Sequence, residues 1–209
     1  MILSPYRWLQ HFIFCVMLSC FLGCSQNQSE QLKQLTVWKT DLKSEIQALG
    51  YRNWIVIADA SFPFYNRSGI RTVVAPVETP EIVSEVISTI ETTQHVKPQF
   101  YVARELNAIK NRQAPGITTF RQKLETSLKG QKVTEIDDAT LNRLLQGTSS
   151  TYAILVIKSQ TSLPYTSVFV ELDSGYWDAE AEQELRKRLN KKASDSGEGH
   201  ESNANLAKT

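Results

Sequence analysis

The sequence predicts an α/β protein, with a single layered domain whose mostly parallel sheet is flanked by helices. Two observations support this prediction. Short apolar runs rich in β-branched residues alternate along the chain with segments of helical periodicity. The run over residues 152–157 is apolar at every position, as expected of a parallel strand that is buried on both faces. The roughly 140 residues of this alternating region are enough for one hydrophobic core.

The same patterns predict each element in order. Apolar residues recur at three- and four-residue spacing from Leu32 to Leu49, which indicates an amphipathic helix that ends at Gly50. Strands are predicted over 54–58, 71–75, 99–103, 132–136, 152–157 and 167–172. Helices are predicted over 79–90, 118–129 and 137–145. The folded domain is therefore placed at residues 35–177.

Both ends of the chain differ in composition from this domain. Arg7 and His11 precede an apolar run over 12–22, which is shorter than the ~20 residues needed to span a bilayer and is typical of a signal peptide. After the domain, a charged helix is predicted over 178–190, with acidic residues before basic ones, as the helix dipole favours. Residues 191–209 have few apolar side chains and are expected to be disordered.

Cys24 is a candidate lipidation site. Gly23 and Cys24 end the apolar run and a polar segment follows, a pattern typical of a bacterial lipoprotein signal whose cysteine accepts diacylglycerol. It predicts a signal peptide over 1–23, a polar tether over 24–34, and a lipid-anchored protein of the bacterial cell envelope that faces the periplasm or the exterior. Ser25 is unlike the aspartate of inner-membrane retention signals, which favours the outer membrane. The alternative is an ordinary secretory signal with an incidental cysteine.

Composition excludes several kinds of site. All three cysteines lie in the leader or at its end, so the domain has no disulfide and no thiol nucleophile. His95 is the one histidine that falls within the domain, which leaves no histidine-based metal site. The net charge of +1 gives no electrostatic reason to expect nucleic acid as a partner. The residues suggest no cofactor.

Asp59 is the first candidate site residue. It follows directly after the predicted strand 54–58, and Pro63 prevents that strand from continuing. Ligands of open α/β sheets bind outside the carboxyl ends of the strands, so an acid in this place is a candidate for binding or catalysis. The alternative is that Asp59 starts a turn by accepting a hydrogen bond from the backbone that follows it.

Four segments together resemble one protein family. They are residues 49–53, 59–63 (Asp-Ala-Ser-Phe-Pro), 69–71 and 164–167 (Pro-Tyr-Thr-Ser). In this order they are similar to the D-ribose pyranase and L-fucose mutarotase family, over about residues 35–175. Two positions depart from the family pattern, because Tyr51 stands in place of a histidine and Ser167 in place of an asparagine.

The resemblance implies a fold of this family's type and a cofactor-independent isomerase. Such an enzyme interconverts the anomers or the pyranose and furanose forms of a monosaccharide, which would be the ligand. The residues expected to serve are Asp59, Tyr51 and Tyr165 in catalysis and Arg71, Glu105 and Ser167 in sugar binding. A homo-oligomer is also implied, with sites formed between subunits.

Loss of the family histidine weakens the prediction of catalysis. A histidine with a pKa near ~6.5 exchanges protons at neutral pH, whereas a tyrosine near ~10 holds its proton and is a poor base. We expect Tyr51 to lie within reach of Asp59 and mutarotation to be weak or absent. The alternatives are a monosaccharide-binding protein without catalysis and a structural or assembly lipoprotein. For single residues, Tyr51 and Tyr165 could serve only in packing, and Arg71 could pair with an acid.

Overall fold

Six strands form the sheet at the centre of the protein. The computed structural model describes residues 37–201, and in it the strands lie in the order β2-β5-β1-β6-β3-β4. Their bounds are β1 Trp54–Ala58, β2 Ile70–Val74, β3 Val96–Ala103, β4 Val133–Ile136, β5 Ile154–Lys158 and β6 Val168–Ser174. The central strands β1 and β6 therefore come from opposite ends of the domain sequence.

The sheet is mixed but mostly parallel. β1, β2 and β5 pair in parallel, as do β3 and β4, whereas β6 is antiparallel to both of its neighbours, β1 and β3. All strands except β6 therefore run in one direction, and their carboxyl ends share the edge of the sheet at which β6 begins. The predicted α/β class with a mostly parallel sheet is confirmed.

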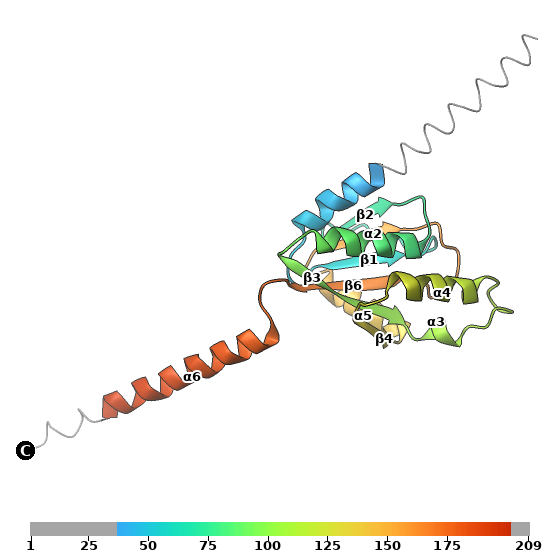
Figure 1. Cartoon of the computed structure of the whole chain (residues 1–209). Coiled ribbons are helices and arrows are strands. Elements are labelled where there is room, and N and C mark those ends of the chain that lie inside the picture. Colours follow the sequence, from blue (N-terminus) through green and yellow to red (C-terminus); the bar gives the residue numbers. More distant parts are fainter. Residues whose placement is uncertain (1–36, 202–209) are drawn as a thin grey trace, which may run out of the picture.

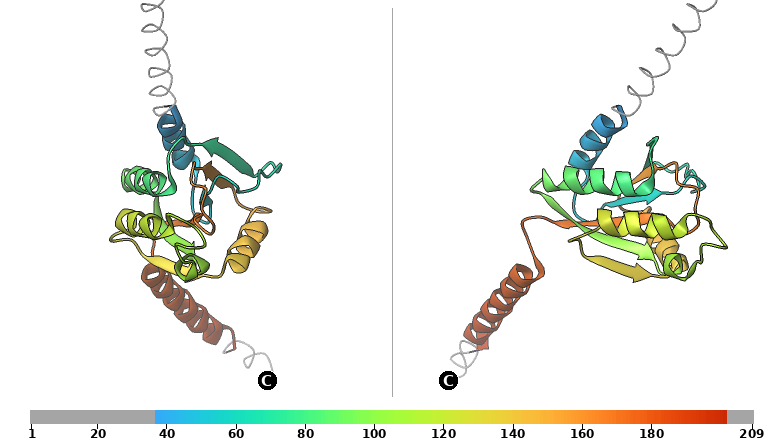
Figure 2. Two further views of the ribbon diagram at one scale, coloured as in Figure 1. Left: turned by 90° about the vertical axis from the view of Figure 1, so that its right-hand side faces the viewer. Right: turned by 45° about the vertical axis from the view of Figure 1, so that its right-hand side comes forward.

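Helices cover both faces of the sheet (Figure 1). The N-terminal helix over residues 37–48, α2 (Thr79–Glu91) and α4 (Ile117–Ser127) lie on one face, and α5 (Asp138–Thr148) lies on the other. The left view in Figure 2 shows the two helix layers on either side of the sheet. A short helix, α3 (Glu105–Ala108), follows β3 directly. The domain is thus built of three layers.

Alternation along the strands builds a hydrophobic core on each face. Ile55 and Ile57 of β1 belong to the core under α2 and α4, whereas Trp54 and Val56 belong to the core under α5. Phe169 of β6 lies in this second core and is almost fully buried. Burying a side chain of this size stabilises a fold by about 1.5–3 kcal/mol. Because β1 is buried on both faces, it fixes the position of Asp59, the residue that follows it.

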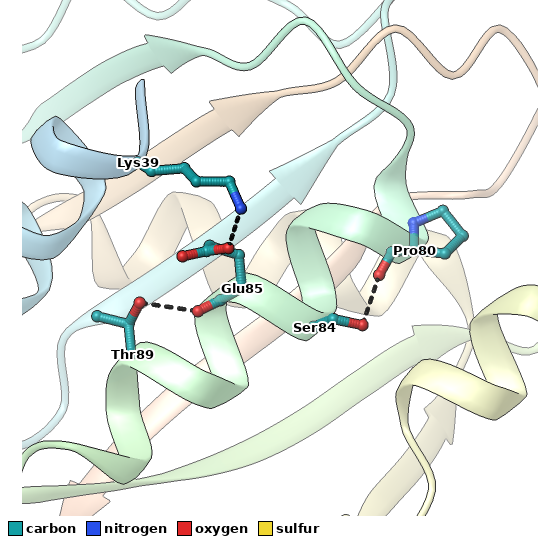
Figure 3. Close-up of polar contacts among 5 residues, drawn as sticks. All are labelled: Lys39, Pro80, Ser84, Glu85 and Thr89. Atoms are coloured by element: carbon teal, nitrogen blue, oxygen red, sulfur yellow. Dashed lines mark hydrogen bonds and ion pairs between the residues drawn. The ribbon is translucent and has the colours of Figure 1, made fainter. Parts of the chain in front are cut away.

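The N-terminal helix is docked by apolar packing and by one ion pair. Trp38, Leu42 and Ile46 are buried at the spacing of one helix face, which is the face predicted from the sequence. On the outer side, Lys39 Nζ contacts the Glu85 carboxylate of α2, as Figure 3 shows. Both side chains of this pair are partly exposed, so it contributes at most about 1 kcal/mol. The apolar face therefore provides most of the docking energy.

β3 is longer than the sequence predicts. It begins at Val96 rather than at residue 99, and Pro98 lies inside it. Proline lacks the N–H that a strand with two neighbours would use. Here β3 pairs only with β6 around Pro98, because the pairing with β4 starts at Phe100. The proline is tolerated because this part of β3 is an edge.

α6 (Ala179–Glu201) extends away from the sheet (Figures 1 and 2). It runs past Asn190, where the sequence analysis ends the charged helix and begins a disordered tail. Ion pairs at i,i+4 spacing link Arg186 to Glu182 and Arg188 to Glu184 within the helix. The lysine and alanine residues that follow Asn190 are good helix formers, so a low apolar content does not prevent a helix there.

Several predicted segments lie outside the described residues. These are the signal peptide over 1–23, the tether over 24–34 and the last part of the predicted tail, 202–209. Cys24 is among them, so its lipidation stays a prediction. No helix within residues 37–201 has the length and apolar content needed to cross a membrane.

Gly175→Ala is expected to lower the free energy of unfolding by about 1–3 kcal/mol, the usual penalty of overpacking. A Cβ at Gly175 would lie 2.4 Å from the Gln94 carbonyl oxygen and 2.9 Å from the Val96 nitrogen, and both are backbone atoms that cannot swing aside. Urea denaturation measures the effect. Gly147→Ala is the control, because no atom lies within 4 Å of its new Cβ and alanine favours the helix. Equal stability of the two variants would contradict this prediction.

Candidate functional site

A pocket opens at the edge of the sheet where β1 and β3 end and β6 begins. Its volume is about 360 Å³. The lining combines acidic, amide and hydroxyl groups with aromatic and proline rings: Asp59, Ser61, Asp138, Asn142, Ser167, Tyr165, Phe62, Phe169, Pro63 and Pro164. Open α/β sheets bind their ligands at this edge.

Two serines fix the Asp59 carboxylate. The backbone N–H and the hydroxyl of Ser61 both donate to Asp59 Oδ1, at 2.8 and 2.6 Å. Ser167 Oγ donates to Asp59 Oδ2 at 2.8 Å and accepts from the Asp59 N–H at 3.1 Å. The bond from the Ser61 N–H is the turn bond that the alternative interpretation of Asp59 predicts. The Asp59 carboxylate also lines the pocket, so the turn at Asp59–Ser61 orients this carboxylate toward the pocket.

Buried polar groups hold the loop that carries Tyr165. Thr161 Oγ1 accepts from the Thr79 N–H at the start of α2, and the Thr161 carbonyl accepts from the Ala60 N–H, both at 2.9 Å. Tyr165 has a φ of 58°, a left-handed conformation that costs a non-glycine residue about 1–3 kcal/mol. Such strain persists only where the surrounding structure imposes it. The result is a partly exposed ring on the wall of the pocket.

α5 brings a second carboxylate to the pocket. Asp137 caps this helix by accepting from the Thr140 N–H at 2.9 Å, so the helix begins at Asp138, one residue later than the sequence predicts. Asn142, one turn later, donates to Asp138 Oδ2 at 2.9 Å. The Asp138 N–H is shared between the two carboxylate oxygens of Glu105, at 3.1 and 3.2 Å. Asn142 thus holds the side chain of Asp138, and Glu105 holds its backbone.

The surroundings of Asp138 raise its pKa above the ordinary value of 3.8. Burial is the largest cause, and the negative charge of Glu105 is the next that acts in this direction. Asp59 and Asp137 add smaller effects of the same sign, while the hydrogen bond from Asn142 opposes them. Asp138 therefore keeps its proton to a higher pH than an exposed aspartate does.

The structure brings together three of the residues predicted from the sequence. Asp59, Tyr165 and Ser167 line one pocket, although Asp59 precedes the other two by about a hundred residues in the chain. Ser167 contacts Asp59 directly. Their roles in binding and catalysis stay predictions.

Tyr51 lies away from this pocket. The next residue, Arg52, donates its N–H to the Leu172 carbonyl at 2.7 Å, and the strand between Leu172 and Ser167 spans roughly 16 Å. Tyr51 therefore lies at the opposite end of β1 from Asp59. A buried strand separates Tyr51 from Asp59 within one chain, so the contact expected between them is not made there, and a contact between subunits stays a prediction.

Arg71 and Glu105 do not line the pocket, and each contacts another protein group. Arg71 lies on the edge strand β2, and its side chain pairs with Glu45 of the N-terminal helix at 2.8 Å. This is the ion pair that the sequence analysis left open as an alternative. Glu105 lies beside the pocket and binds the backbone of Asp138. Its effect on a ligand would therefore act through Asp138.

Sequence reasoning missed Asp138 and Asn142 as site residues. A signal was present, because Asp138 follows a predicted strand, as Asp59 does, and parallel strands end at the same edge of a sheet. Asn142 lies four residues after Asp138, which puts both side chains on one face of a helix. What the sequence did not reveal is that α5 packs on the face of the sheet next to the end of β1.

The pocket can hold a small hydroxylated molecule. Two carboxyl groups, an amide and two hydroxyl groups offer donors and acceptors, and the rings of Phe62 and Tyr165 offer apolar contacts. No group of three or more histidine, cysteine or acidic side chains in the described part of the chain is arranged to hold a metal ion.

Asp138→Asn is expected to raise the free energy of unfolding at pH 7. Because folding raises this pKa, the contribution of Asp138 to stability is fully present below about pH 3.8 and is lost as the pH rises through the folded-state pKa. The folded protein at pH 7 thus carries an unfavourable charge that asparagine removes. Urea denaturation at pH 7 and at low pH should show a gain that shrinks as the pH falls.

Asp137→Asn is the matched control for this stability measurement. Hydrogen bonds with Thr140 lower the Asp137 pKa, so this charge has the opposite sign of effect on stability at pH 7. Asparagine is also a good helix cap, which preserves the start of α5. Equal gains from the two variants would reflect net charge alone and would contradict the interpretation of Asp138.

Comparison with known proteins gives structural similarities only. No family model and no curated protein matches the chain. The chain is similar to the Bacillus subtilis protein RbsD complexed with D-ribose, at 18% identity and a TM-score of 0.45, over 64% of this chain and 91% of that chain. It is also similar to the fucose mutarotase from Streptococcus pneumoniae in complex with L-fucose, at 16% identity and a TM-score of 0.44, over 68% and 94%. FucU from Bifidobacterium longum gives 13% identity and a TM-score of 0.42, over 64% and 94%.

Proposed function

We propose that the pocket binds a monosaccharide and interconverts its anomers or ring forms at a low rate. The observation that carries this proposal is the Asp59 carboxylate, held by Ser61 and Ser167 on the wall of a pocket that also contains aromatic rings. Mutarotation needs a group that withdraws the proton of the anomeric hydroxyl and a group that protonates the ring oxygen. It needs no cofactor.

The size and chemistry of the pocket support a single sugar ring. Its volume of about 360 Å³ lies near the lower end of the usual range for small-molecule sites. A sugar ring has C–H faces that pack on aromatic rings such as Phe62 and Tyr165, and hydroxyl groups that donate to carboxylates. The resemblance of residues 59–63 and 164–167 to ribose pyranases and fucose mutarotases supports the same ligand class.

NMR of the sugar tests this function. D-ribose, L-fucose and D-galactose are incubated with the purified protein, and saturation is transferred between their anomeric protons. Exchange above the rate in buffer supports the isomerase, and protein-to-sugar saturation transfer without exchange supports a monosaccharide-binding protein. Neither signal with any of the three sugars would contradict the proposal and favour a structural role.

The location rests on the N-terminal sequence alone, and we propose lipidation at Cys24. Cys24→Ala should abolish incorporation of an alkyne-labelled fatty acid into the protein, whereas Cys20→Ala should keep it. Two or more acyl chains anchor a protein stably, since each buried methylene contributes ~0.8 kcal/mol. A fatty-acid label that persists in Cys24→Ala would contradict the proposed site. The homo-oligomer that the resemblance implies also stays a prediction.

A further inference from the structure

We propose that Asp138 is the general acid of this pocket and acts together with Asp59 as the base. The inference rests on the proposed function and names a proton donor for it. Besides Asp59, the catalytic residues expected from the resemblance are Tyr51 and Tyr165. Tyr51 does not reach the pocket within one chain, whereas Asp138 lines the same pocket as Asp59.

The two carboxyl groups are held in different ways. Asp59 accepts three side-chain or backbone hydrogen bonds to its carboxylate, which orient both of its oxygens. Among the described residues, Asn142 is the one donor to the Asp138 carboxyl group, and it binds a single oxygen. Asp138 Oδ1 is therefore left to exchange a proton or a hydrogen bond with a ligand.

The charges around Asp138 favour its neutral form. Glu105 and Asp137 flank it from α3 and from the preceding residue, and Asp59 faces it from the end of β1. The amino end of α5 opposes them, because a helix dipole favours negative charge there. Glu105 already occupies the Asp138 N–H at that end, and the net effect of all groups is a raised Asp138 pKa.

The proton transfers of ring opening balance between the two acids. The carboxylate of Asp59 takes the proton of the anomeric hydroxyl, and that O–H electron pair becomes the second bond of the C1 carbonyl. The bond between C1 and the ring oxygen breaks, and its electron pair stays on the ring oxygen, which takes the proton of Asp138. After rotation about C1–C2, the reverse transfers close the ring and return both protons.

Asp138→Asn tests the assignment, with Asp41→Asn as the control. Asp41 is an exposed carboxylate on the N-terminal helix and does not line the pocket. At a pH below the Asp138 pKa, where Asp138 holds its proton, we expect Asp138→Asn to slow the exchange of D-ribose or L-fucose anomers by about 10²–10⁴-fold, the usual contribution of a general acid. Saturation transfer from the protein to the sugar should persist in this variant. Asp41→Asn should exchange the sugars at the wild-type rate.

The pH profile separates catalysis from a structural role. In the wild type, exchange above the buffer rate should fall as the pH rises through the Asp138 pKa, and Asp138→Asn should lose this dependence. A variant that exchanges like the wild type, or a wild-type rate independent of pH, would overturn the role of Asp138 and leave the isomerase standing. Binding without any wild-type exchange would overturn it too, and absence of binding would overturn the proposed function itself.

Discussion

Asp59→Asn is expected to lower the rate of anomer exchange by about 10²–10⁴-fold without unfolding the protein. Asparagine has the shape of aspartate, and its oxygen can still accept the two bonds from Ser61. Its amide can donate to Ser167 Oγ, which now donates to the carboxylate. The turn and the pocket wall would remain, but no carboxylate would be left at this position to take the proton of the anomeric hydroxyl.

Saturation transfer between the anomeric protons measures this loss, and protein-to-sugar transfer checks that binding persists. Asp41→Asn is a suitable control, because Asp41 is an exposed carboxylate on the N-terminal helix, away from the pocket lining. It should leave the exchange rate unchanged. If Asp59→Asn exchanged sugars as fast as Asp41→Asn, proton transfer would not depend on Asp59, and a different base would have to be found.

The strands and helices could be predicted because their patterns are local. β1 and the first four residues of β5 are continuous apolar runs, and α5 begins at the aspartate pair where the sequence predicts the start of a helix. The order of the strands is not local. That β6 inserts between β1 and β3, antiparallel to both, follows from packing of distant segments and leaves no mark in the periodicity of any one of them.

The ends of the strands could be located from the sequence and placed Asp59 and Ser167 at one pocket, whereas no sequence pattern showed how far Tyr51 lies from Asp59 within one chain. Asp59 and Ser167 come from two segments that flank paired strands, and the pairing of β1 with β6 brings them into contact. Tyr51 was expected beside Asp59 on the strength of the resemblance. A strand of five residues lies between the two positions, and its length alone places them at opposite edges of the sheet.

The position of Asp138 shows why its role could not be predicted from the residue alone. An aspartate at the start of a helix is ordinarily a capping residue that the helix dipole keeps ionised. Here Asp137 is the cap, and Glu105, from a short helix that the sequence did not predict, binds the next N–H. The pKa of Asp138 thus depends on burial, on its neighbour Asp137 and on two acids from other parts of the chain, Glu105 and Asp59.

Phe169→Ala is expected to weaken both the fold and the pocket, because Phe169 belongs to each. Its side chain is 1% exposed, packs in the core under α5 and lines the pocket. Deleting a buried phenylalanine ring costs about 3–5 kcal/mol of folding free energy. The lost wall should also reduce sugar affinity by about tenfold, the effect of losing roughly 1.4 kcal/mol of ring contact.

Phe100→Ala separates these two effects. Phe100 is equally buried on β3, but it faces the core under α2 and α4 and does not line the pocket. Both variants should lower the urea midpoint by similar amounts, since each removes one buried ring from a central strand. Sugar affinity, measured at a temperature where both variants are folded, should fall in Phe169→Ala and stay at the wild-type value in Phe100→Ala. Equal sugar affinities of Phe169→Ala and Phe100→Ala would mean that the sugar does not contact the Phe169 wall of this pocket. The proposed binding site would then lie elsewhere on the molecule.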